Sequence, residues 1–285
     1  MLYSCARSRA PSLHHQLRYS RSLLSRSNSH SLKLIPSNYS STTTTTSIMS
    51  TPDITLYTDN TPNGHKIPII LEELGLPYKL EQLSIQTGAQ KKEWFLKINP
   101  NGQIPALTDG KQRVFDSGAI LLYLADKYDP EGKVSYRPGT PEYYEQLSWI
   151  FWQIGGLGPQ GGAALSFSTF APVRSDYAIE KFLSGYKNLL GVLEYRLKES
   201  PYLAGEKYTI ADIASFTWAA QGAAALDIDL AEWPHVKAWT DRIVQREAVQ
   251  KGLVTPKPPF DLEQFKVMLR GQREALMKKE NSDKH

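Results

Sequence analysis

Apolar residues between positions 54 and 75 follow two periods, and each period predicts a different element. A short apolar run at 54–58 is typical of a β-strand, and the turn TPNGHK at 61–66 follows it. Beyond this turn the spacing i, i+3, i+4, i+7 predicts a helix with one buried face, formed by Ile67, Ile70, Leu71 and Leu74. Pro68 would then lie in the first helical turn, where its missing N–H costs nothing, and Gly75 would end the helix.

The same reasoning extends the first unit to Tyr128. In chain order it predicts a second strand at 78–84, a short helix at 90–95, strands at 104–108 and 113–115, and a helix that begins at 116–117. Asp109 and Gly110 make a typical hairpin turn between the last two strands. Pro105, at a strand start, is expected at a sheet edge, at a bulge or after a cis bond. The order βαβαββα predicts an α/β unit with a mixed sheet flanked by helices.

No strand pattern follows the Pro- and Gly-rich stretch at 129–141. The second unit, residues 139–258, is therefore predicted to be all-α, with helices at 143–154, 175–198 and 209–220 and from Pro234 onward. The run GGLGPQGG at 155–162 is expected to break or bend the first of these helices. It is either a plain kink or a device that makes room for a second substrate. Residues 261–285 are expected to form a charged tail.

The charged residues divide the chain into a basic leader and a nearly neutral body. Residues 1–52 carry six basic residues and no acidic one, and the other 27 basic and 29 acidic residues give the body a net charge of −2. Such a body is unlike a nucleic-acid-binding protein. Residues 1–50 have the Arg- and Ser-rich, acid-free composition of a mitochondrial transit peptide, or else of a merely disordered leader. Met49 is a candidate second start that would give a cytosolic form.

Cysteine usage limits the chemistry of the body. Cys5, the single cysteine, lies in the leader, so the body has no internal disulfide, Cys-x-x-Cys pair or thiolate metal site. Any thiol chemistry must use a thiol that a substrate brings. The turn before the first helix offers a place for it, because free N–H groups and the helix dipole favour an anion. The Thr61 hydroxyl or the Asn63 amide could donate to a thiolate, although the same residues also make a plain turn, with His65 facing solvent. No apolar run is long enough to span a membrane.

Several longer motifs carry a resemblance to a known family. They are NPNGQIPAL at 99–107, DSGAI at 116–120, TIAD at 209–212 and WPHVKAW at 233–239. In this order they resemble the glutathione transferases. TPNGHK at 61–66 and FWQIGGLGP at 151–159 resemble the branch that holds the nu-class disulfide-bond reductases and the fungal nitrogen regulator. The resemblance implies a thioredoxin-like domain over 53–130, a helical domain over 139–258, glutathione as co-substrate, no metal, and a homodimer.

The resemblance also implies roles for individual residues. Asn63, with Thr61, would hold the glutathione sulfur, and the backbone of Ile104 would bind the cysteinyl part. Asp116, where this branch usually has Glu, would pair with the γ-glutamyl ammonium, and Ser117 would bind the carboxylate. Further polar contacts are expected from Gln90, Lys91 and Lys181. Lys181 stands where the bacterial relatives have an Arg that reaches across the dimer. Aromatic candidates for a second-substrate pocket, or for part of the core, are Trp149, Trp152 and Phe167.

The function that these residues imply is an enzyme that activates the glutathione thiol. Two reactions stay open: conjugation to an electrophile, as in detoxification, and thiol–disulfide exchange with two glutathione molecules, as in a reductase or peroxidase. The alternative is a non-catalytic regulatory or binding protein on the same scaffold. The Arg- and Ser-rich leader favours the enzyme, because the regulator usually has an Asn- and Gln-rich leader. A third possibility, an assembly module of translation factors, is disfavoured by Thr61, Asn63, Asp116 and Ser117.

Overall fold

The computed structural model describes residues 51–256, 267 and 271. The leader at 1–50 lies outside the described residues, and so does the tail at 261–285 apart from residues 267 and 271. The predictions for both segments stay predictions. Among the helices of the described part, none is long and apolar enough to cross a membrane.

A mixed sheet of four strands organises the first half of the described chain. Its strands are β1 (Ile54–Thr58), β2 (Tyr78–Gln82), β3 (Ala106–Asp109) and β4 (Gln112–Phe115), in the spatial order β2-β1-β3-β4. β2 runs parallel to β1, whereas β3 runs antiparallel to both β1 and β4. Side chains alternate between the faces of a strand, so this sheet needs cover on both sides. Leu56 and Leu107 face the main core, whereas Tyr57 and Ala106 face a smaller cluster around Phe95.

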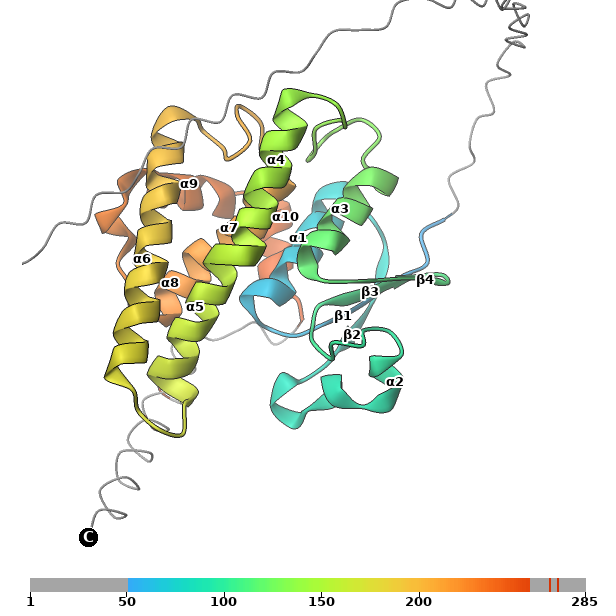
Figure 1. Ribbon diagram of the computed structural model, residues 1–285. Coiled ribbons are helices and arrows are strands. Elements are labelled where there is room, and N and C mark those ends of the chain that lie inside the picture. Colours follow the sequence, from blue (N-terminus) through green and yellow to red (C-terminus); the bar gives the residue numbers. More distant parts are fainter. Residues whose placement is uncertain (1–50, 257–266, 268–270, 272–285) are drawn as a thin grey trace, which may run out of the picture. The chain divides into compact units, whose positions relative to one another are not determined.

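Helices provide that cover (Figure 1). α1 (Pro62–Leu74) and α3 (Ser117–Tyr128) lie together on one face of the sheet. α2 (Glu93–Leu96) lies on the other face, after the short 3₁₀ turns η1 (Ile85–Thr87) and η2 (Ala89–Lys91). The predicted order βαβαββα is confirmed, and the Ile104–Pro105 bond is cis, one of the three possibilities that the position of Pro105 left open.

Helix α1 begins earlier than its apolar pattern indicates. Thr61 is the N-cap, because its Oγ1 accepts a 3.0 Å hydrogen bond from the backbone N–H of Gly64. Gly64 is required at this place, since a Cβ there would lie 2.0 Å from the carbonyl oxygen of Asp59. The prediction for Pro68 was wrong: this proline lies inside the helix rather than in its first turn.

Pro68 is tolerated because another group satisfies the carbonyl that it leaves unpaired. A proline inside a helix cannot donate to the carbonyl four residues earlier, which here belongs to Gly64. The hydroxyl of Thr58, the last residue of β1, donates to that oxygen at 3.0 Å, and Thr58 is fully buried. The end of the strand therefore holds the beginning of the helix.

The second half of the described chain is helical, as predicted. Its helices are α4 (Pro141–Trp152), α5 (Gly158–Leu165), α6 (Asp176–Glu199), α7 (Ile210–Thr217), α8 (Ala223–Ala225), α9 (Pro234–Val244) and α10 (Glu247–Leu253), with a 3₁₀ turn η6 (Leu230–Glu232). Thr209 and Asp212 form a reciprocal capping box at the start of α7, where the sequence predicts one. Asp212 also accepts a 3.0 Å hydrogen bond from the indole N–H of Trp239, which ties α7 to α9.

Of the two outcomes expected for the glycine-rich run, a break or a bend, the break does not occur. The chain continues from α4 through the π-helical segment η3 (Gln153–Leu157) into α5 and a second π-helical segment η4 (Ser166–Phe170). A Cβ on Gly161 would lie 2.9 Å from the ring of Trp218, and one on Gly158 would lie 2.8 Å from Nε2 of Gln153. At these two positions the space beside the glycines is filled by protein side chains, so they do not make room for a second substrate, one of the two alternatives for this run.

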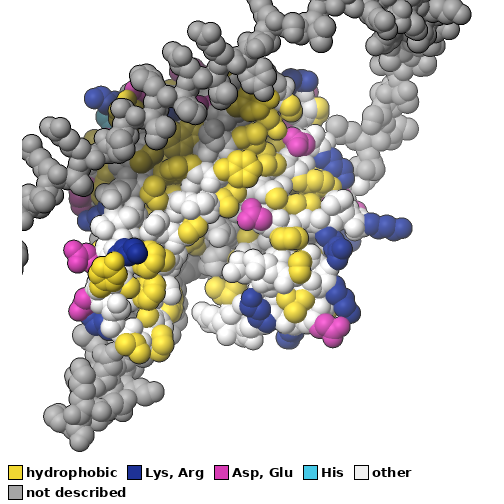
Figure 2. Space-filling view, in the orientation of Figure 1, with side chains coloured by type: hydrophobic (Ala, Val, Ile, Leu, Met, Phe, Trp, Pro, Cys, Tyr) yellow, Lys and Arg dark blue, Asp and Glu magenta, His cyan; other side chains and the backbone are white. Residues whose placement is uncertain are grey.

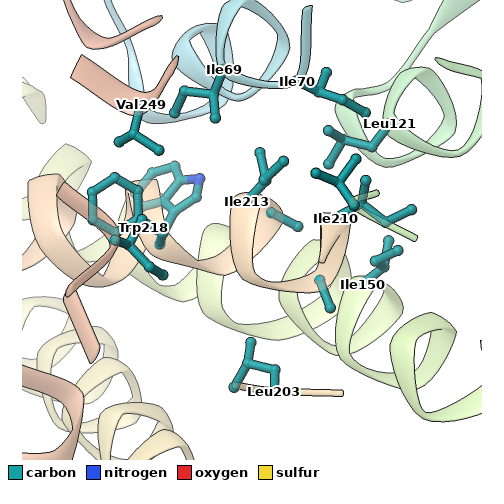
Figure 3. Close-up of a cluster of buried hydrophobic side chains, with 14 of the residues drawn as sticks. Ile69, Ile70, Leu121, Ile150, Leu203, Ile210, Ile213, Trp218 and Val249 are labelled. Atoms are coloured by element: carbon teal, nitrogen blue, oxygen red, sulfur yellow. The ribbon is translucent and has the colours of Figure 1, made fainter. Parts of the chain in front are cut away.

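The main hydrophobic core is shared by helices of both halves (Figure 3). Figure 3 labels members from α1, α3, α4, α7 and α10, among them Ile70, Leu121, Ile150, Ile213 and Val249. Trp218, the first residue of the π-helical segment η5 (Trp218–Gly222), lies at one end of the cluster. Because α1 packs against α7 and α10 as well as against the sheet, its position is fixed by both halves of the molecule.

We expect Thr58→Val to lower the free energy of unfolding by about 1–3 kcal/mol, because the buried carbonyl of Gly64 would lose its donor. Denaturant unfolding followed by circular dichroism measures the change. Thr55→Val is the matched control, since it makes the same substitution at a half-buried residue of β1, and we expect a change within about 0.5 kcal/mol. Equal losses in the two variants would contradict the role assigned to Thr58.

Candidate functional site

The sheet register brings three chain segments to one end of the sheet. Tyr57 of β1 pairs with Ala106 of β3, and Ala106 pairs with Phe115 of β4. The turn into α1, the Ile104–Pro105 bond before β3 and the turn into α3 therefore lie side by side. Five of the predicted site residues are on these segments: Thr61, Asn63, Ile104, Asp116 and Ser117.

Asn63 is held in one orientation by the helical domain. The indole Nε1–H of Trp218 donates to Oδ1 of Asn63 at 2.8 Å. An indole nitrogen is a donor and never an acceptor, so this bond decides which end of the amide faces Trp218. The Nδ2 amino group consequently points away from the indole, and it has no hydrogen-bond partner within the described residues. Trp218 is itself held by Tyr186, whose hydroxyl donates to the Trp218 carbonyl at 2.6 Å.

Thr61 combines two roles at the N-terminus of α1. Its Oγ1 accepts the N-cap bond from Gly64, which accounts for one lone pair of the hydroxyl. The hydroxyl hydrogen remains to be donated to a group bound beyond the helix end. Thr61 and Asn63 can therefore act as two directed donors beside the positive end of the α1 dipole.

Asp116 adopts a backbone conformation that is uncommon for a residue other than glycine. Its φ is +70°, and its Oδ1 accepts from the backbone N–H groups of Gly118 at 2.9 Å and Ala119 at 3.4 Å. Residues held at positive φ often occur at functional sites, where the surrounding structure maintains them. The Oδ2 atom has no hydrogen-bond partner among the residues that the structure describes, and the side chain is exposed. Asp116 thus caps α3 with one oxygen and presents the other to solvent.

Lys66 is a site residue that the sequence analysis missed. Its side chain is 1% exposed, and its Nζ donates to Ser117 Oγ at 3.2 Å and to Gln153 Oε1 at 2.7 Å. Burial lowers the pKa of Lys66 to about 7, against an opposing contribution from the charge of Asp116. A signal was present in the sequence, because Lys66 lies four residues before Ile70 and so shares the buried face of α1.

His65 is also buried, and the prediction that it faces solvent was wrong. Its Nδ1 lies 3.0 Å from the side-chain amide of Gln221 in the helical domain, and its Nε2 lies 3.2 Å from Oδ1 of Asn60. Burial lowers the pKa of His65, against the opposing effects of the Gln221 hydrogen bond and the charge of Asp59. Burial therefore favours the neutral imidazole, and the contact with Gln221 links the two domains.

Gln90 and Lys91 lie on η2, beside the loop that leads to Ile104. A Cβ added to Gly102 would meet the Gln90 carbonyl and the Lys91 side chain at 3.0 Å, which shows how closely these segments approach. Lys91 Nζ donates to the carbonyl of Asn101 at 3.3 Å, and Gln90 Oε1 is buried without a partner among the described residues. Gln90 and Lys91 therefore lie next to the loop that leads to Ile104, and their role in binding stays a prediction.

Matches to family descriptions cover both domains. Residues 52–126 match the glutathione S-transferase N-terminal domain, and residues 167–247 match the glutathione S-transferase C-terminal domain. The chain belongs to the glutathione S-transferase family. This assignment confirms the family and the thioredoxin-like and helical domains that the sequence predicts.

Curated relatives of this family member agree with the assignment. It is 42% identical over 208 residues to the disulfide-bond oxidoreductase YfcG of Escherichia coli, and the match covers 70% of this chain and 94% of the relative. It is 37% identical over 208 residues to glutathione S-transferase 2 of Schizosaccharomyces pombe, and this match covers 66% of this chain and 89% of the relative.

Solved structures of similar proteins contain glutathione. A glutathione transferase homologue from Lodderomyces elongisporus, with two glutathione molecules per subunit, has a TM-score of 0.70 and 39% identity, covering 72% of this chain and 99% of that chain. The glutathione transferase URE2P6 from Phanerochaete chrysosporium, in complex with oxidised glutathione, has a TM-score of 0.68 and 42% identity, covering 70% of this chain and 94% of that chain.

The remaining predicted site residues of this glutathione S-transferase lie on the helical domain. The rings of Trp149 and Trp152 pack 5.1 Å apart, edge to face, against the main core. Phe167 stacks on Phe182 with centroids 5.3 Å apart, and Lys181 Nζ lies 6.0 Å from the Phe182 ring. These contacts join the residues to the helical domain rather than to the sheet domain. Figure 2 shows hydrophobic side chains at this end of α5 and α6, separated by a recess from the α2 end of the sheet domain.

The lowered pKa of Lys66 predicts a pH-dependent stability difference. The unfolded chain holds this proton up to its ordinary pKa of 10.5, whereas the folded protein releases it near pH 7. Between these values the unfolded state binds more protons, so the free energy of unfolding should rise with pH. Relative to Lys66→Met, we expect wild-type stability to rise by up to about 1.4 kcal/mol per pH unit in this window.

Denaturant titrations of both proteins at a series of pH values measure this difference. Lys92→Met, which removes an exposed lysine, is the control and should follow the wild-type profile. A wild-type minus Lys66→Met difference that stays constant from about pH 7 to about pH 10 would contradict the lowered pKa.

Proposed function

We propose that the protein is an enzyme that binds glutathione at the three chain segments that meet at one end of the sheet and uses the glutathione thiolate to reduce disulfides. The observation that carries the proposal is the fixed amide of Asn63, whose Nδ2 faces away from Trp218 at the N-terminus of α1. Relatives named disulfide-bond oxidoreductases, and similar structures with two glutathione molecules or with oxidised glutathione, support this reaction class.

The two ends of the γ-glutamyl group find complementary partners at α3. The outward carboxylate oxygen of Asp116 can accept from the ammonium, and the Ser117 hydroxyl and backbone N–H can donate to the carboxylate. The backbone of Ile104 can bind the cysteinyl part of the tripeptide along the edge of the sheet. The glutathione sulfur is then directed to the N-terminus of α1, which is the neighbouring segment in the sheet register.

Thiol activation follows from the electrostatics of this end of α1. The helix dipole favours the thiolate through a diffuse field, and Asn63 Nδ2 and the Thr61 hydroxyl can donate directed hydrogen bonds to it. The sequence from residue 6 to residue 285 contains no cysteine. The nucleophile is therefore the thiolate of glutathione itself.

The reaction balances with two glutathione molecules. The first thiolate attacks one sulfur of the substrate disulfide, which forms a mixed disulfide with glutathione and releases the other sulfur as a thiolate that takes up a proton. The second glutathione attacks the glutathione sulfur of the mixed disulfide, so the products are two substrate thiols and oxidised glutathione. The protein supplies binding and thiolate stabilisation, and no protein group changes oxidation state.

Conjugation to an electrophile is the second candidate, because it uses the same thiolate. The recess in Figure 2, bordered on the helical side by hydrophobic side chains, could hold an apolar electrophile. The assignment of Phe167 to a second-substrate pocket stays a prediction. The similarity to glutathione S-transferase 2 of Schizosaccharomyces pombe also favours conjugation.

Two further proposals concern assembly and location. We propose a homodimer to which Lys181 contributes. We also propose mitochondrial import directed by residues 1–50, with a cytosolic form that starts at Met49.

We expect Asn63→Asp to raise the pKa of bound glutathione and to lower disulfide reduction roughly 10- to 100-fold. The substitution keeps an oxygen for the Trp218 indole but replaces the amino donor with a charge that repels the thiolate. Asn63→Ala should lose less disulfide-reduction activity than Asn63→Asp, and Thr61→Ala should lose less than Asn63→Ala. Because Thr61→Ala removes the N-cap of α1, it should also cost about 1 kcal/mol of stability. Ultraviolet absorbance of the bound thiolate against pH, and turnover of a glutathione mixed disulfide, are the two measurements.

Asp116→Asn serves as the matched comparison because it keeps the α3 cap but removes the negative charge. It should weaken glutathione binding roughly 10-fold or more while the pKa of the bound thiol stays at the wild-type value. A haloarene assay on the same proteins separates conjugation from reduction. Unchanged thiolate titration in Asn63→Asp would contradict the role of Asn63, and absence of glutathione binding by the wild type would contradict the function itself.

A further inference from the structure

Lys66 is a fully buried lysine with neutral hydrogen-bond partners. Its Nζ contacts the Ser117 hydroxyl and the Gln153 amide oxygen, and within the described residues no carboxylate lies at ion-pair distance from it. Buried charges are normally paired, because removing an isolated charge from water is costly. An anion bound nearby would supply the missing counter-charge. The position of Ser117 at the first residue of α3 indicates where that anion binds.

The bond from Lys66 also decides what the Ser117 hydroxyl can do. When Lys66 is protonated, its ammonium group has donors and no acceptor, so Ser117 Oγ must accept from it. The hydroxyl hydrogen is then directed away from Lys66, toward the end of α3. Two other donors of this helix end, the N–H groups of Gly118 and Ala119, already bind Asp116 Oδ1. The Ser117 side chain is therefore a principal donor left for an anion at α3.

We propose that Lys66 is a positioning residue for the γ-glutamyl carboxylate of glutathione: its ammonium orients the Ser117 hydroxyl toward the ligand and provides the buried counter-charge. The inference rests on the proposed function, since glutathione brings the carboxylate. Gln153, which accepts the shorter bond from Lys66, belongs to η3 of the helical domain. The carboxylate site is thus completed by a residue that lies far from α3 in the sequence.

A proton accompanies the ligand in this arrangement. In the ligand-free protein, burial lowers the pKa of Lys66 to about 7. A carboxylate at Ser117 favours the charged lysine and raises that pKa. Above about pH 7, binding should therefore transfer a proton from solvent to Lys66 Nζ.

Other titratable groups near α1 have partners of their own. Asp116 on α3 is the acid whose charge acts on Lys66. On the other elements that pack against α1, and on α1 itself, most charged or titratable side chains are bonded elsewhere, namely His65 to Gln221, Glu72 to Tyr78, Glu73 to Arg246, Asp212 to Trp239, Lys127, Tyr123 and Tyr128 to Asp109, and Glu247 to Lys251. Asp126 on α3 is exposed to solvent. The linked proton is accordingly assigned to Lys66.

Isothermal titration calorimetry with S-methylglutathione tests the inference on the full-length protein. The methyl group removes thiol ionisation from the measurement. Titrations at about pH 8 in two buffers of different ionisation enthalpy give the number of protons taken up on binding. We expect roughly half a proton per site for the wild type, and a value near zero at about pH 6, where Lys66 is already charged.

Two variants separate positioning from a merely structural role. Gln153→Glu keeps the acceptor for Lys66 but adds a buried carboxylate, so Lys66 should be charged before the ligand arrives. Proton uptake should fall to near zero, and affinity should fall roughly 10-fold because the counter-charge is already used. Lys66→Met should lose both the affinity and the pH-dependent uptake, while the small contribution of the ligand's own amino group remains.

The outcomes are distinguishable. Binding by the wild type without proton uptake at about pH 8, or uptake that persists in Gln153→Glu, would overturn the role of Lys66 and leave the proposed function standing. Failure of the wild type to bind S-methylglutathione at all would overturn the proposed function and the inference together. Uptake that is present in the wild type and absent in Gln153→Glu supports the inference even if Lys66→Met does not fold.

Discussion

The hydrogen bond from Trp218 to Asn63 is the interaction on which the proposed chemistry of this site depends. Asn63 stands at the N-terminus of α1 in the sheet domain, whereas Trp218 begins η5 in the helical domain. The indole can only donate, so it fixes the amide with its amino group directed away. Trp218 in turn occupies a place that exists because Gly158 and Gly161 carry no side chain. A donor in one domain is therefore oriented by the packing of the other.

The first turns of α1 repeat this dependence. Asn63, His65 and Lys66 each bond to a residue of the helical domain, namely Trp218, Gln221 and Gln153. Polar groups are costly to bury unless they are hydrogen-bonded, so these contacts favour one relative placement of the two domains. The hydrophobic core that α1 shares with α7 and α10 supplies most of the packing between the domains. The polar contacts specify how the two domains are positioned relative to each other. Substitutions in the helical domain should therefore change the geometry at the N-terminal end of α1.

Sequence periodicity predicted most of the secondary structure, because strands and helices with one buried face leave a regular pattern. It also placed Asp116 at the start of α3 and the capping box at Thr209, since caps depend on residues close in sequence. It failed where a distant residue decides the outcome. The sequence around Gly158 suggests a break or a bend, whereas the structure continues the helix there and fills the space beside Gly158 with Gln153 and Trp218. Pro68 suggests a helix start, whereas the Thr58 hydroxyl satisfies the Gly64 carbonyl and lets Pro68 lie inside the helix. The orientation of Asn63 could not be predicted, because its partner lies 155 residues away.

A crystal structure of the protein with reduced glutathione tests the central claim most directly. The account predicts that the sulfur lies within about 3.5 Å of Asn63 Nδ2 while Oδ1 still accepts from the Trp218 indole. The γ-glutamyl group should lie between Asp116 and Ser117 in the same complex. A sulfur bound elsewhere, or an Asn63 amide that has left Trp218 to reach the ligand, would contradict the claim that the helical domain sets the thiol-activating donor in advance.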